Sequence, residues 1–117
     1  MGFDAMSANM YAGKLIRADL AGDPAQVTVA EVTEVLFEGT SCYVKPNQAA
    51  TWRELLIVRT SAGILLRDRV RESRDNKDRT ISCDWQSFPT VLACACWLVD
   101  SNKLEARAKV RLIRLGK

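Results

Sequence analysis

The feature that most constrains this chain is an alternation of apolar and other residues with period two, which recurs along much of its length. Such alternation places successive side chains on opposite faces of a β-strand. The clearest case is residues 90–115. A two-residue turn at Ser101 and Asn102 pairs the two halves of this segment as a hairpin, with Asp100 opposite Lys103 and apolar side chains along one face.

The other face of this predicted hairpin is asymmetric, because only its second strand carries charged residues there. The residues of the first strand on that face are Leu92, Cys94, Cys96 and Leu98. A strand that is apolar on both faces is usually covered by another layer or by a second subunit. These four residues therefore form the predicted seam of a homo-oligomer.

A second hairpin is predicted within residues 52–73, with Gly63 supplying the backbone freedom that a tight turn needs. Two registers compete. A three-residue loop sets Arg53 opposite Arg71 and gathers a basic patch. A two-residue loop at Ala62 and Gly63 instead pairs Glu54 with Arg71 and Arg53 with Glu72, which neutralises much of that patch. The sequence leaves the choice open.

The remaining segments complete an all-β prediction. Residues 12–20, 40–46 and 80–86 are predicted strands, and β-branched residues favour a strand at 24–38, where helix-capping residues leave one short helix as the alternative. We expect a small antiparallel barrel or sandwich of about seven strands. Residues 1–12 are predicted to be an N-terminal arm, and residues 13–117 a single β domain.

The sequence lacks the residues that several classes of chemistry require. The chain contains no histidine and no glycine-rich phosphate-binding motif, so we predict a protein that is not an enzyme and holds no cofactor. Its four cysteines lack zinc-site spacing, so no metal is expected either; they read as small buried residues of a reducing compartment. Cys94 or Cys96 would be reactive only if Lys109 and Arg107 lay across the hairpin from them.

The longest uncharged run covers residues 85–99 and is interrupted by Pro89. It is shorter than the roughly 20 residues that a membrane span needs. The N-terminus also lacks the pattern of a signal peptide. We therefore predict a cytoplasmic protein that does not bind membranes.

Basic residues supply the functional hypothesis. They recur with period two in two places: at Arg67, Arg69 and Arg71, and again at Arg107, Lys109 and Arg111. Period two places each trio on one face of a sheet, spaced to follow a phosphate chain, and arginine suits bidentate phosphate contact. Acidic residues interleave within Arg67–Arg79, so the second trio is the stronger candidate. Trp52 and Trp85 are candidate platforms for base stacking.

The predicted function is thus a non-enzymatic binding module that binds nucleic acid through these six residues. One alternative is a homo-oligomeric scaffold or protein-interaction domain with no nucleic-acid role. Another is a small barrel that binds an apolar ligand. The sequence specifies neither the type of nucleic acid nor whether a small-molecule ligand exists.

Overall fold

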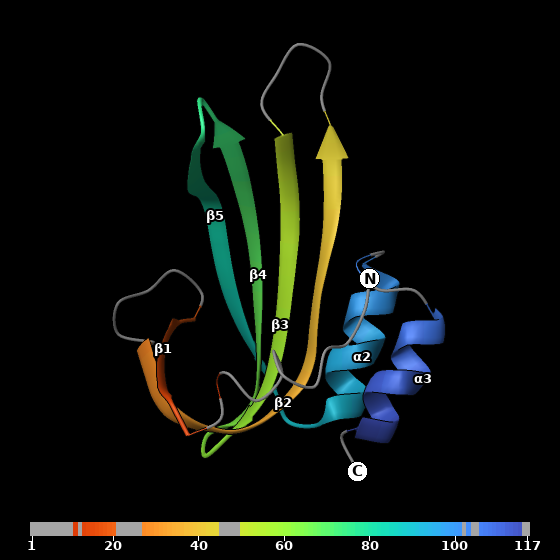
Figure 1. Ribbon diagram of the computed structural model, residues 1–117. Coiled ribbons are helices and arrows are strands. Elements are labelled where there is room, and N and C mark those ends of the chain that lie inside the picture. The colour runs from red at the N-terminus through yellow and green to blue at the C-terminus, as the bar shows by residue number, and fades with distance from the viewer. Residues whose placement is uncertain are drawn as a thin grey trace.

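The computed structural model describes residues 11, 13–20, 27–44, 50–101, 103 and 106–115. Within these ranges five strands form one antiparallel sheet in which each strand pairs with the next in sequence (Figure 1). The strands are β1 (Leu15–Asp19), β2 (Val27–Val44), β3 (Ala50–Thr60), β4 (Gly63–Arg74) and β5 (Lys77–Phe88). Two helices follow them, α2 (Val91–Asp100) and α3 (Ala106–Leu115).

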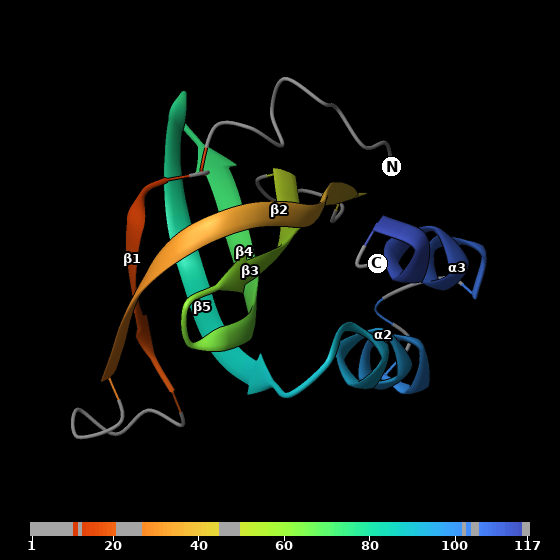
Figure 2. The same ribbon diagram turned by 90° about the horizontal axis from the view of Figure 1, so that it is seen from below.

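The sheet curls into a nearly closed barrel because β2 bends strongly (Figure 2). Two irregularities in its pairing with β3, between Val32 and Glu34 and between Val35 and Phe37, interrupt the ladder where such a bend is needed. The bend carries β1 towards β5, and a parallel bridge joins Leu20 to Trp85. The predicted antiparallel all-β fold is confirmed, with five strands in place of about seven.

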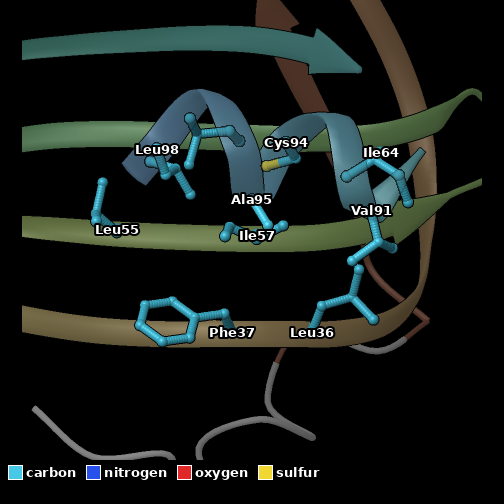
Figure 3. Packing of buried hydrophobic residues seen from close by; sticks show 10 residues of the cluster. Leu36, Phe37, Leu55, Ile57, Ile64, Val91, Cys94, Ala95 and Leu98 are labelled. Carbon is cyan, nitrogen blue, oxygen red and sulfur yellow. The ribbon is translucent and has the colours of Figure 1, made fainter. Parts of the chain in front are cut away.

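Two cores lie on opposite faces of this sheet, and β3 contributes to both. Its residues Leu56 and Val58 belong to the core inside the curled sheet. Leu55 and Ile57 point to the other side, toward α2 (Figure 3). The buried residues of the inner core are Ala18, Val32, Val35, Leu56, Val58 and Leu65. Those of the outer core are Leu36, Phe37, Leu55, Ile57, Ile64, Leu66, Val91, Cys94, Ala95 and Leu98.

The predicted C-terminal hairpin is wrong, because residues 91–100 and 106–115 are helical. The apolar residues of the first segment fit both the period of a strand and that of a helix face. Those buried against the sheet are Val91, Cys94, Ala95 and Leu98. Their spacing is that of one helix face. Thr90 starts α2 as its N-cap, since its hydroxyl accepts a hydrogen bond from the Ala93 N–H at 3.1 Å.

The predicted oligomer seam does not exist as one face, because those four residues lie on a helix. Cys94 and Leu98 are buried in the outer core, whereas Leu92 is 54% exposed. Cys96 is half-buried. The sequence predicted that the strand apolar on both faces lies in this segment. In the structure that strand is β3.

The hairpin of β3 and β4 follows neither predicted register. Thr60 pairs with Gly63 across a turn at Ser61 and Ala62, which sets Glu54 opposite Arg69. The Thr60 hydroxyl donates to the Gly63 carbonyl at 2.9 Å and accepts from the Ala62 N–H at 3.0 Å. These side-chain hydrogen bonds favour a turn that backbone preferences alone did not indicate.

Three further predictions concern residues 24–38, the N-terminal arm and the absence of a membrane span. Residues 27–38 are part of β2, so the helix alternative is wrong there, and residues 24–26 lie outside the described ranges. Of the predicted N-terminal arm, only Tyr11 is described. Neither described helix is long and apolar enough to cross a membrane.

An acidic side chain ties the helices to the outer face of the sheet. Asp68 of β4 is only 7% exposed, yet it forms ion pairs with Arg53 at 3.2 Å and with Lys103, which follows α2. The Lys103 ammonium also lies 5.0 Å from the centre of the Trp97 ring. Asp68 therefore joins one cation of the sheet to one that follows α2.

Candidate functional site

Three arginines of β4 form a row along the inner face of the sheet. The period of two in Arg67, Arg69 and Arg71 places them on the same face as Leu65, which belongs to the inner core. All three are half-buried. The sequence predicted this shared face, and we call these residues the arginine row.

The acidic residues that interrupt this stretch of sequence lie on the opposite face. Asp68 is engaged by Arg53 and Lys103, as described above. Glu72 accepts a hydrogen bond from the Nε of Arg79 at 3.2 Å and also lies 3.6 Å from the Nε of Arg74. The alternating charges of β4 therefore separate by face, and these two acids do not neutralise the arginine row.

Aromatic rings flank both ends of the row. The guanidinium of Arg67 lies 6.0 Å from the ring centres of both Tyr11 and Trp85, and that of Arg71 lies 6.0 Å from the Trp52 ring. Such stacking orients a guanidinium while leaving its charge available. Trp52 and Trp85 are half-buried, so both rings keep some exposed surface.

Glu54 occupies the middle of the row. Its carboxylate accepts hydrogen bonds from the Nε of Arg69 at 2.7 Å and from the indole N–H of Trp52 at 3.2 Å. Burial by itself would raise the pKa of Glu54, but these hydrogen bonds and the charges of Arg69 and Arg71 lower it below its ordinary value. The carboxylate is therefore ionised at neutral pH.

The two end arginines differ from the central one. Within the described part of the chain, no carboxylate lies at ion-pair distance from Arg67 or Arg71. The Nε atom of each is buried and has no hydrogen-bond acceptor among the described residues. The row thus consists of two arginines with no ion-pair partner among the described residues, on either side of one that is paired.

The second basic trio does not form a row. Arg107, Lys109 and Arg111 belong to α3, where residues two apart point to nearly opposite sides of the helix. The prediction that they share a sheet face is therefore wrong. Arg111 is exposed and Lys109 is half-buried, and the side chain of Arg107 lies outside the described part.

Sequence reasoning missed Tyr11 and gave Glu54 a different partner. Tyr11 lies far from β4 in the sequence and sits in the segment predicted to be an arm. Glu54 was expected to face the row only in the two-residue register, opposite Arg71, whereas the observed register sets it opposite Arg69. Either register places a carboxylate against an arginine of the row, which was the signal that the sequence offered.

Models of protein families, curated proteins and solved structures were compared with this chain, and none of the three comparisons gave a match.

The cysteines give a test of the outer core. Cys83 is exposed on β5, whereas burial raises the pKa of the Cys94 thiol to about 12. We expect a maleimide reagent at pH 8 to label Cys83 within minutes and to leave Cys94 unlabelled until denaturant is added. Peptide mass spectrometry after each step measures both. Labelling of native Cys94 at the rate of Cys83 would contradict the packing of α2.

Proposed function

We propose that this protein is a non-enzymatic module that binds single-stranded nucleic acid across the inner face of its sheet. The observation that carries this proposal is the arginine row. Its end members, Arg67 and Arg71, have no ion-pair partner among the described residues and lie 6.0 Å from aromatic ring centres. Guanidinium groups bind phosphates in bidentate fashion. Half-buried rings beside them can stack their exposed part on bases.

A single strand suits this face better than a duplex does. The rings at both ends of the row can stack only on bases whose faces are free, and duplex bases already stack on one another. The row also lies within the concave side of a curled sheet, where a flexible strand can follow the curvature. We therefore expect single-stranded DNA or RNA to bind more tightly than duplex DNA of equal length.

The first test is fluorescence anisotropy with labelled single-stranded DNA, single-stranded RNA and duplex DNA over a series of salt concentrations. We expect saturable binding of the single strands, with log affinity falling linearly with log salt as counterions are released. Absence of binding at low salt, or preference for the duplex, would contradict the proposal.

Fewer observations support the two alternative functions, a homo-oligomeric scaffold and an apolar-ligand barrel. A homo-oligomer no longer has the predicted seam to support it. An apolar ligand would need space among inner-core residues such as Val32, Leu56 and Leu65, which are at most 1% exposed and pack against one another. Among the described residues, no feature supports a homo-oligomer or an apolar-ligand site as the arginine row supports nucleic-acid binding.

A further inference from the structure

Glu54 divides the arginine row into separate cationic sites. Its carboxylate holds Arg69 through a hydrogen bond and an ion pair. Arg67 and Arg71 project from the same face, two positions before and two positions after Arg69. The side chains of Glu54 and Arg69 are 26% and 24% exposed, so a ligand on this face can reach the pair. A phosphate that approaches Arg69 must therefore compete with a carboxylate already in place.

The spacing of the two end arginines matches a particular segment of nucleic acid. Arg71 lies four positions after Arg67 on β4, which corresponds to about 13 Å in a strand. Phosphates of a stacked strand repeat about every 3.4 Å along its axis, and an extended strand repeats at roughly twice that spacing. Two extended repeats therefore span the distance between the cations, with one phosphate left opposite Arg69.

We propose that the site engages alternate phosphates of an extended single strand, and that Glu54 is the residue that sets this pattern. Arg67 and Arg71 each bind a phosphate. Glu54 withholds Arg69 from the phosphate between them, and its hydrogen bond to the indole N–H orients the Trp52 ring beside Arg71. This inference depends on the proposed function, because it concerns the ligand of the same site.

The salt dependence of binding tests the inference directly. Each phosphate engaged on a single strand contributes a slope of about −0.7 to log affinity against log salt. With a labelled oligothymidylate, we expect about −1.4 for the unaltered protein, from two phosphates, and about −2.1 for Glu54→Gln, which releases Arg69. That extra contact corresponds to about fivefold tighter binding at 0.1 M salt.

A double variant serves as the control. The pair Glu54→Gln with Arg69→Gln keeps the net charge of the protein and should return the slope to about −1.4, because no cation is then released at the centre of the row. Thermal melting of each variant establishes that it is folded before its affinity is measured.

The outcomes separate this inference from the proposed function. If the unaltered protein binds no single strand, the proposed function fails. If it binds with a slope that Glu54→Gln leaves unchanged, or if the double variant keeps the steeper slope of Glu54→Gln, the role of Glu54 fails while the binding function stands.

Discussion

Changing Arg67 and Arg71 together to glutamine is expected to weaken binding of a single-stranded oligonucleotide by about 100-fold. Each substitution removes a charge-assisted contact worth at least about 1.5 kcal/mol, and about 1.4 kcal/mol corresponds to a tenfold change in affinity. Fluorescence anisotropy at fixed low salt measures the loss. Thermal melting of the same double variant shows whether the fold is intact.

The matched control removes the same charge from elsewhere on the protein. Arg111 and Arg114 are exposed on α3, away from the arginine row, so their double change to glutamine should alter affinity by no more than about threefold at the same salt. Equal losses from the two double variants would mean that net charge alone attracts the oligonucleotide.

Changing Leu98 to alanine is expected to lower the free energy of unfolding by about 2 to 5 kcal/mol. Leu98 is fully buried in the outer core, where α2 packs against the sheet, so the shortened side chain leaves a cavity. Urea denaturation followed by circular dichroism measures the change. A loss of this size would be a large part of the stability of a domain this small.

Leu92→Ala is the control for Leu98→Ala, because it makes the same chemical change on the same helix. Leu92 is 54% exposed, so we expect its replacement to change the free energy of unfolding by about 0.5 kcal/mol or less. If residues 91–100 formed a strand with both leucines in one seam, the two variants would instead lose similar amounts. Similar losses would therefore contradict the helical packing.

The strands could be predicted because their side chains alternate between two environments that differ in polarity. In β4, Arg67, Arg69 and Arg71 alternate with Asp68, Val70 and Glu72, and a strict period of two does not fit one face of a helix. The helices could not be separated from strands in the same way. In residues 91–98, alanine and cysteine fill the positions between larger apolar residues, so the segment fits a strand period and a helix face equally well.

The candidate site was predicted in part, for a physical reason that concerns register. Period two was enough to place Arg67, Arg69 and Arg71 on one face. It could not show which acids face them, because a shift of one residue in the pairing of β3 exchanges Glu54 for a neighbour on the opposite face. Hydrogen bonds of the Thr60 hydroxyl favour the observed turn, and a hydroxyl at that position is a weak signal in a sequence.

The position of β3 between the two cores has a consequence for cooperativity. Leu56 and Val58 belong to one core, and Leu55 and Ile57 to the other, so neither core can open without exposing one side of the same strand. The barrel and the helix pair are therefore expected to unfold in a single transition. A ligand that binds the native barrel then raises the free energy of opening for the helices as well, although they lie on the far side of the sheet.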